Sequence, residues 1–199
     1  MNLKEFRLLV LVVTAVLALI VALPGLQRLL VFPTGESFSE FWLLGPGHGT
    51  EGYPRNITRG ENNAVFLGVS NHLGRCANYL VQVKFRNFSQ SAPEWLNRTP
   101  SSLASLYSVK FFVAAEETWE LPVIFSFDYS YNSALSQVSC NRLIFNGAML
   151  DLNGYSISWT SNRTVFFGDL FFELWVYNDT VGGFQYHERY VNLQLNMTV

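Results

Sequence analysis

The stretch Val123-Ile-Phe-Ser-Phe-Asp-Tyr-Ser-Tyr131 decides the fold class of this 199-residue chain. Its aromatic and aliphatic side chains stand at every second position, and polar residues such as Ser126 and Asp128 fall between them. Because successive side chains of a β-strand point to opposite faces of a sheet, this alternation predicts a strand with one buried and one solvated face. The same period recurs over Tyr79–Phe85 and Val191–Met197, which is typical of half-buried antiparallel sheets.

Further apolar runs bring the expected number of strands to eight or nine. They lie at Glu40–Leu44, Val65–Asn71, Leu106–Ala114, Arg142–Phe145, Tyr155–Thr160 and Val165–Tyr177. Asn146-Gly147, Asn153-Gly154 and Gly182-Gly183 predict hairpins, since Asn and Gly adopt the positive φ of tight turns. Ser89–Ser105 is expected to be a long loop with one helical turn. Without long amphipathic helices to connect parallel strands, the sequence predicts a mainly β fold, an immunoglobulin-like antiparallel β-sandwich.

A hydrophobic run precedes these strands. Leu8–Leu26 contains no charged residue, and as a helix it would span about 28 Å at ~1.5 Å per residue, which matches the hydrocarbon core of a bilayer. Lys4 and Arg7 place the N-terminus in the cytoplasm by the positive-inside rule. We therefore expect residues 1–32 to form a cytoplasmic tip and a transmembrane anchor, and residues 36–199 an extracytoplasmic β-sandwich domain.

A cleaved signal peptide is the alternative interpretation of this N-terminus, because a basic start followed by an apolar segment suits both. The length of the apolar run and the lack of a small-residue cleavage site after Leu23 favour a retained anchor. The expected location is thus the cell membrane, with a single pass, the N-terminus inside and the C-terminal domain outside.

Composition limits the partners of the domain. Charged residues make up 14% of the chain, against roughly 25% in an ordinary soluble domain, while aromatic residues reach 16%. The formal net charge is −2, and the sequence contains no basic patch that would indicate nucleic-acid binding. The expected partners are the membrane and a protein or glycan at its outer surface, or further copies of the chain.

Two kinds of covalent modification are expected outside the cytoplasm. Cys76 and Cys140 both follow the anchor, where an oxidising compartment favours a disulfide; two free thiols are the alternative. Six N-x-Ser/Thr sequons predict glycosylation at Asn56, Asn87, Asn97, Asn162, Asn178 and Asn196.

A search for metal and cofactor motifs gives no site. His48, His72 and His187 are far apart, and none stands with a second His or Cys at metal-ligand spacing. Asp151-Leu-Asn-Gly154 begins like a calcium loop but is too short for one. The glycine-rich segment 45–52 lacks the Lys-Ser/Thr of a phosphate-binding loop, although its backbone N–H groups would favour an anion. We expect no metal and no cofactor.

Catalytic patterns are equally sparse. Asp128, Asp169 and Glu173 are candidates for the acid/base pair of a glycoside hydrolase, but their separation in sequence does not place them together. No nucleophile-elbow motif occurs, so we expect that the protein is not an enzyme. Trp95 stands alone in a polar segment and is the first candidate for an exposed contact residue.

Several segments carry a family resemblance: Phe38-Ser-Glu-Phe-Trp-Leu-Leu-Gly-Pro-Gly, Glu51-Gly-Tyr-Pro, Gly60-Glu-Asn, Gly68-Val-Ser-Asn-His72 and Asn78-Tyr-Leu-Val-Gln-Val83, with a weaker match at Glu173-Leu-Trp-Val176. They resemble the outer portion of a prokaryotic, largely archaeal, membrane family called domain of unknown function 1616 (DUF1616). The resemblance implies several hydrophobic helices before an extracytoplasmic β-domain. This chain departs by having one helix and an added stretch between Asn87 and Trp119. The family supplies no catalytic residues to carry over.

The sequence thus favours a membrane-anchored extracellular β-sandwich protein of unknown biochemical activity, a binding or structural module at the cell surface or in a membrane complex. The alternative is a subunit of an extracellular filament or surface lattice assembled by strand exchange. An enzyme acting on envelope sugars is a third class, which requires carboxylates that are clustered in a cleft.

Overall fold

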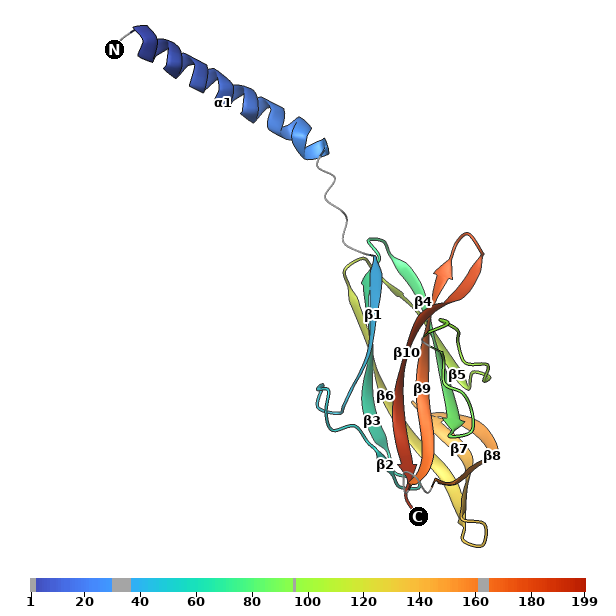
Figure 1. Ribbon diagram of the computed structural model, residues 1–199. Helices are drawn as coiled ribbons and strands as arrows, with labels where there is room; N and C mark the ends of the chain where they lie inside the picture. The colour runs from blue at the N-terminus through green and yellow to red at the C-terminus, as the bar shows by residue number, and fades with distance from the viewer. Residues whose placement is uncertain (1–2, 30–36, 95, 161–164) are drawn as a thin grey trace. The chain divides into compact units, whose positions relative to one another are not determined.

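The structure is a computed structural model that describes residues 3–29, 37–94, 96–160 and 165–199. The chain divides into two compact units, Met1–Ser37 and Phe38–Val199. The first contains helix α1 (Leu3–Leu29), drawn in blue in Figure 1. Its segment Phe6–Leu23 is long and apolar enough to cross a membrane. The predicted apolar N-terminal helix is confirmed, and a single-pass anchor is consistent with it.

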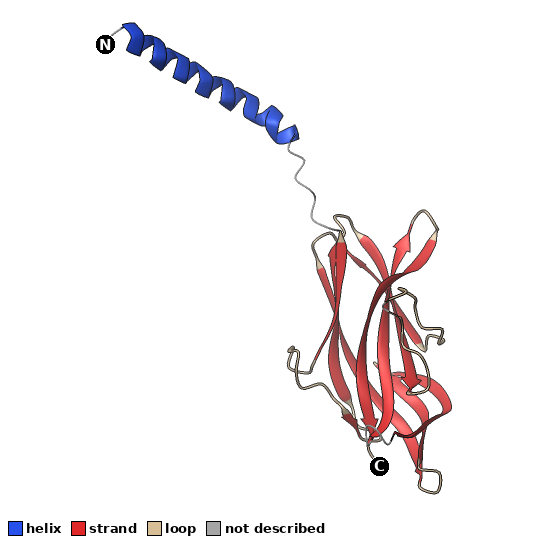
Figure 2. Cartoon of the chain, in the orientation of Figure 1, coloured by secondary structure: helices blue, strands red, loops and turns tan. Residues whose placement is uncertain are grey.

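The described part of the second unit is built from strands (Figure 2). They are β1 (Phe38–Leu44), β2 (Asn56–Ile57), β3 (Asn63–His72), β4 (Ala77–Asn87), β5 (Tyr107–Val113), β6 (Thr118–Asn132), β7 (Gln137–Phe145), β8 (Ala148–Thr160), β9 (Val165–Asn178) and β10 (Gly183–Met197). The mainly β class is therefore confirmed.

The strands form one sheet that curls upon itself. Its order is β1-β3-β6-β7-β8-β9-β10-β2, with β4 added alongside β9 and β5 alongside β4. All neighbours are antiparallel except β10 and β2, which are parallel. Strand β8 joins the two halves of the curled sheet: it pairs with β7 and, in the part of the chain that the structure describes, with β9 through Trp159 and Thr160. An immunoglobulin-like sandwich is not confirmed, because the sheet is continuous through this link.

The core lies inside the curled sheet, between the two halves that face each other. The alternating positions named in the sequence fill it: the rings of Phe85 and Phe127 lie 5.1 Å apart, and those of Phe145 and Phe172 lie 6.3 Å apart. The first pair joins β4 to β6 and the second joins β7 to β9, so each pair connects the two halves of the sheet. The alternation with a period of two therefore predicts correctly which side chains of these strands point into the core.

The outer face of β4 and β9 is also buried, which the alternation did not predict. Lys84, expected to face solvent, is buried on β4, and Glu173 is buried on the neighbouring β9, where its register partner on β4 is Gln82. The cause is the segment 88–106, which connects β4 to β5 (the green loops beside β5 in Figure 1). Its described residues form turns and an isolated bridge between Glu94 and Thr99 instead of the expected helical turn.

Two of the three expected hairpins are present. Asn146-Gly147 connects β7 to β8, and the turn ending at Gly182 connects β9 to β10. Asn153-Gly154 instead lies inside β8, where both residues have positive φ and the register with β7 shifts. That hairpin prediction was wrong, because two residues with positive φ can also make a bulge that bends a continuing strand.

Asn71 ties three parts of the domain together at the end of β3. It is fully buried, and its Nδ2 donates to the carbonyl oxygens of Arg75 (2.8 Å), Val113 (2.9 Å) and Ala114 (3.1 Å). Its Oδ1 accepts hydrogen bonds from the Leu73 N–H and the Tyr79 hydroxyl. One amide thus satisfies the backbone of the β3–β4 turn and of the end of β5.

The predicted disulfide between Cys76 and Cys140 is not formed in this structure, where both thiols are free. Cys76 is exposed in the turn before β4, whereas Cys140 faces the core from β7. Burial raises the pKa of the Cys140 thiol to about 12, so it remains protonated at neutral pH.

This difference predicts selective thiol labelling. At pH 8 a maleimide should modify Cys76 in the native protein, and Cys140 only after denaturation, because the thiolate is the reactive form. Mass spectrometry of the labelled peptides gives the measurement, and Cys76→Ser should remove the native-state reaction. A denatured, unreduced chain with no reactive thiol would instead reveal a disulfide.

Candidate ligand-binding groove

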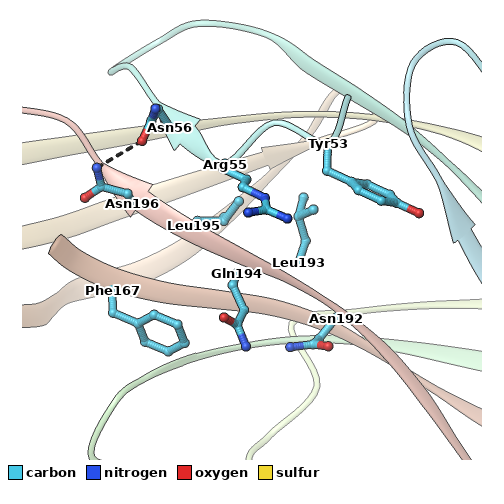
Figure 3. Close-up of a pocket in the computed structure, with 9 residues that line it drawn as sticks. All are labelled: Tyr53, Arg55, Asn56, Phe167, Asn192, Leu193, Gln194, Leu195 and Asn196. Atoms are coloured by element: carbon cyan, nitrogen blue, oxygen red, sulfur yellow. Dashed lines mark hydrogen bonds between the residues drawn. The ribbon is translucent and has the colours of Figure 1, made fainter. Parts of the chain in front are cut away.

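An open groove of about 450 Å³ lies beside β10 and β2. Its lining comes from three parts of the chain: the segment Tyr53–Asn56, the strand residues 192–196 of β10, and Phe167 of β9 (Figure 3). The volume is within the range of pockets that bind small ligands. The β10 residues that line the groove are near the end of that strand, and Figure 1 shows β2 at the same end of the β-domain, away from the start of β1.

The local backbone explains why a groove forms here. β2 pairs with β10 only at Asn56 and Ile57, where the Asn196 N–H donates to the Arg55 carbonyl at 2.7 Å. Before this point the chain leaves β10 and runs toward β1, where the Tyr53 hydroxyl donates to the Leu43 carbonyl at 2.7 Å. The separation between this segment and β10 makes the groove.

The polar side chains of the groove are mainly amides. Asn192, Gln194 and Asn196 occupy alternate positions of β10 and so share its outer face, while Leu193 and Leu195 between them are buried. In Figure 3 Asn192 and Gln194 extend to the same side as Phe167. Amides offer both donors and acceptors, so this face can bind polar groups of either kind.

Among the residues that the structure describes, Arg55 is the one charged side chain that lines the groove. It is exposed, and it takes part in none of the ion pairs found in the described ranges of the chain. Its positive charge is therefore not balanced by a neighbouring carboxylate. An exposed guanidinium in a groove of neutral amides is an attachment point for an anion.

A cluster of buried charges lies beneath the segment 88–106. The Lys84 Nζ donates to the Glu173 Oε2 at 2.8 Å and to the Ser101 carbonyl at 2.9 Å, and the Ser101 N–H donates to the Glu173 Oε1 at 2.6 Å. The side chains of Lys84 and Glu173 are 3% and 0% exposed. This pair therefore fixes both backbone groups of Ser101 and holds the segment on the sheet.

A second pair extends this cluster toward the groove. The Arg86 Nε donates to the Asp169 Oδ2 at 2.7 Å, and the Asn192 Nδ2 donates to the Asp169 Oδ1 at 2.9 Å. The Asp169 side chain is 1% exposed and lies behind the amide of Asn192. Its negative charge is neutralised by Arg86. Asn192 thus connects the lining of the groove to the Arg86–Asp169 ion pair.

The three carboxylates considered for glycoside hydrolysis are not brought together. Asp169 and Glu173 are buried in different ion pairs, and Asp128 lies outside that cluster, paired with the Arg59 Nε at 2.8 Å. Each is held by its own cation. None is exposed in a shared cleft with another.

A serine and a histidine do approach each other, but inside the domain. The Ser39 Oγ lies 2.9 Å from the His187 Nε2 and 2.6 Å from the Tyr79 hydroxyl. Ser39 is 0% exposed, so a substrate has no access to this hydroxyl. Burial lowers the pKa of His187, which keeps its ring neutral. The contact joins β1 to β10 and is structural.

The remaining candidates are separate from the groove. His48 and His72 contact Glu120 and Glu116, and no group of three possible metal ligands occurs among the described residues. In the glycine-rich segment the Gly45 N–H donates to the Gly49 carbonyl and the His48 N–H to the Gly45 carbonyl. These two N–H groups are therefore used within the loop. Trp95 lies outside the described residues.

The predicted glycosylation sites divide by location. Asn87, Asn97 and Asn178 lie at the end of β4, in the segment 88–106 and at the end of β9, while Asn162 is outside the described residues. Asn56 and Asn196 both line the groove, and the Asn196 Nδ2 donates to the Asn56 Oδ1 at 3.0 Å (dashed in Figure 3). Nothing in their sequons indicated that the two asparagines would meet.

Comparison with known families identifies the chain. Residues 33–148, more than half of the sequence, match DUF1616, a domain of unknown function. The chain belongs to the DUF1616 family. The DUF1616 match contains Tyr53, Arg55 and Asn56 but ends at the start of β8, so β10 and Phe167 lie beyond it. One wall of the groove is therefore within the matched region and the other is not.

No curated protein sequence matches this DUF1616 chain. Solved structures with similarity include β-glucosidase from Listeria innocua in complex with gluconolactone (12% identity, TM-score 0.34), with glucose (12%, 0.33) and with isofagomine (13%, 0.35). The alignments cover 82–83% of this chain and 17% of the β-glucosidase chain. At these TM-scores the similarity carries no argument about fold or activity.

Proposed function

We propose that this protein is a non-enzymatic binding module, anchored by α1 with its β-domain on the outer side of the membrane, and that the groove beside β10 is its binding site. Lys4 and Arg7 before the apolar segment support the orientation through the positive-inside rule.

The observation that carries the proposal is the chemistry of the groove. It combines an arginine without a carboxylate partner, a row of amides on one strand and the side chains of Tyr53 and Phe167. Binding sites typically place a few oriented polar groups among apolar ones on rigid elements. The ordered β10 backbone and the Asn192–Asp169 contact supply that rigidity.

A groove-filling variant tests this function. Asn56→Trp places a large side chain at the exposed rim, and Thr58→Ala is the matched control, since it removes the same sequon without filling the groove. Full-length protein purified in a mild detergent should carry a glycan or protein partner, detected by mass spectrometry, in the wild type and in Thr58→Ala. Asn56→Trp should lose it. Equal recovery with all three proteins, or no partner with any, would contradict the proposal.

The orientation has its own test. Because Cys76 is the exposed thiol, a membrane-impermeant maleimide should label it in intact cells, and Cys76→Ser should abolish the label. Labelling only after lysis would place the domain on the inner side.

A filament or lattice subunit is the second candidate. It is favoured by two edge strands: within the described chain β1 pairs only with β3, and β5 only with β4. Such edges can accept a strand from another copy. N-terminal sequencing of the mature protein separates the candidates, since a start between residues 24 and 35 favours a released subunit over an anchored module.

A further inference from the structure

We infer that the ligand of the groove is an acidic saccharide, in which a sugar carboxylate pairs with Arg55 and the hydroxyl groups bind the amides of β10. This inference rests on the proposed function, because it names the ligand class of the same site. It follows from the charge of the groove, from the type of its polar groups and from its dimensions.

The charge of the groove favours a singly charged anion. Arg55 supplies one positive charge, and Asp169, the carboxylate that accepts a hydrogen bond from Asn192 of the groove, is already paired with Arg86. The guanidinium of an arginine matches the geometry of a carboxylate through two parallel hydrogen bonds. One guanidinium balances one carboxylate, whereas a phosphate monoester with nearly two charges would require a second cation.

The neutral groups of the groove favour a saccharide around that anion. A site for a bare anion needs donors only, but the exposed residues Asn192 and Gln194 also bring amide oxygens, which are acceptors, to the groove. The Asn196 amide is already used, because its Oδ1 accepts from the Phe166 N–H and its Nδ2 donates to Asn56. A sugar hydroxyl both donates and accepts, so successive hydroxyls can match amides at alternate positions of a strand. The side chains of Tyr53 and Phe167 complete the lining with apolar surface for the ring.

The dimensions agree with this ligand. A groove of about 450 Å³ is ample for one sugar residue, and its open form allows a chain to continue beyond it. An exposed single ion pair and a few amide contacts provide weak binding at each site. We therefore expect recognition of a repeating polymer by many copies at a membrane.

The test uses two ligands that differ at their carboxyl groups, which are ionised in one and methylated and neutral in the other: an oligogalacturonate and its methyl ester. The full-length chain, produced in a host that adds no N-glycans and held in phosphatidylcholine nanodiscs, is titrated with each by saturation-transfer NMR. The acid should bind about tenfold more tightly than the ester, as expected for one charge-assisted contact. Arg55→Gln should remove this difference.

Arg142→Gln is the matched control, because Arg142 is a partly exposed arginine of β7 outside the groove. It should retain the full preference for the acid. Equal binding of acid and ester by the wild type overturns the acidic ligand while the proposed function stands. So does equal competition by inorganic phosphate, which would indicate an anion site only. If the saccharides fail to bind and Asn56→Trp also loses no partner, both proposals fail.

Discussion

Replacing Lys84 with methionine should lower the free energy of unfolding by about 3–5 kcal/mol, the usual cost of leaving a buried charge unpaired. Lys84 and Glu173 are 3% and 0% exposed, so the isolated carboxylate would have little access to water. The Ser101 carbonyl would lose its partner as well. Denaturant unfolding of the full-length protein in detergent, followed by tryptophan fluorescence, measures the change.

The double variant Lys84→Met/Glu173→Leu separates the charge from the packing. It should lose clearly less stability than the sum of the two single variants, because no buried charge remains in it. Arg142→Met, at a surface pair whose closest atoms are 3.9 Å apart, should change the stability by less than about 0.5 kcal/mol. Single variants as stable as the wild type would mean that the segment 88–106 does not seal this pair from solvent.

Replacing Asn71 with alanine should cost about 3 kcal/mol or more, since each buried group left without a partner costs about 1–3 kcal/mol. The change removes the donor shared by the carbonyls of Arg75, Val113 and Ala114, and the acceptor of the Tyr79 hydroxyl. Urea unfolding at constant pH gives the measurement.

Asn71→Asp distinguishes the two halves of the amide, because it keeps oxygen acceptors but loses the donor to the carbonyls. We expect it to be at least as harmful as alanine, since a buried carboxylate would then face three carbonyl oxygens. Asn62→Ala, at an exposed position just before β3, is the control and should be close to neutral. An alanine variant at position 71 that unfolds like the wild type would show that water replaces the amide.

The sequence predicted the fold where burial follows from local periodicity. Val123–Tyr131 and Tyr79–Phe85 reported the core face of their strands, because side-chain alternation is a property of the strand itself. It could not report that Lys84 is covered as well. The covering segment 88–106 is polar, and Ser101 is held through its backbone, which has no signature in the sequence.

The groove was not predictable for a different reason. Arg55 and Asn192 are more than a hundred residues apart, and only the parallel pairing of β2 with β10 brings them to one site. Asn56 and Asn196 did attract notice as sequons, but a sequon identifies a modification signal and not a partner in space. Arg55 is a candidate for binding an anion because none of the ion pairs among the described residues includes it, and a linear sequence cannot show this.

The segments that carry the family resemblance occupy structural positions. Trp42 packs over Gly68, where even a Cβ atom would lie about 2.3 Å from the indole ring. The Tyr53 hydroxyl donates a hydrogen bond to the Leu43 carbonyl and so links the segment Tyr53–Asn56 to β1. Asn71 links the β3–β4 turn to the end of β5. These residues of the resemblance therefore have roles in the fold, and Arg55, the residue proposed to bind an anion, is not in the segments that carry it.

The parallel pairing of β2 with β10 also sets the order of events during synthesis. The Ile57 carbonyl accepts a hydrogen bond from the Thr198 N–H. Strand β2 therefore stays unpaired until a partner about 140 residues later in the chain has been synthesised. Until β10 emerges, the outer edge of β9 is unpaired and the nascent domain exposes strands that can associate with other chains. The nearly complete domain must therefore be protected from association until its last strand has been made.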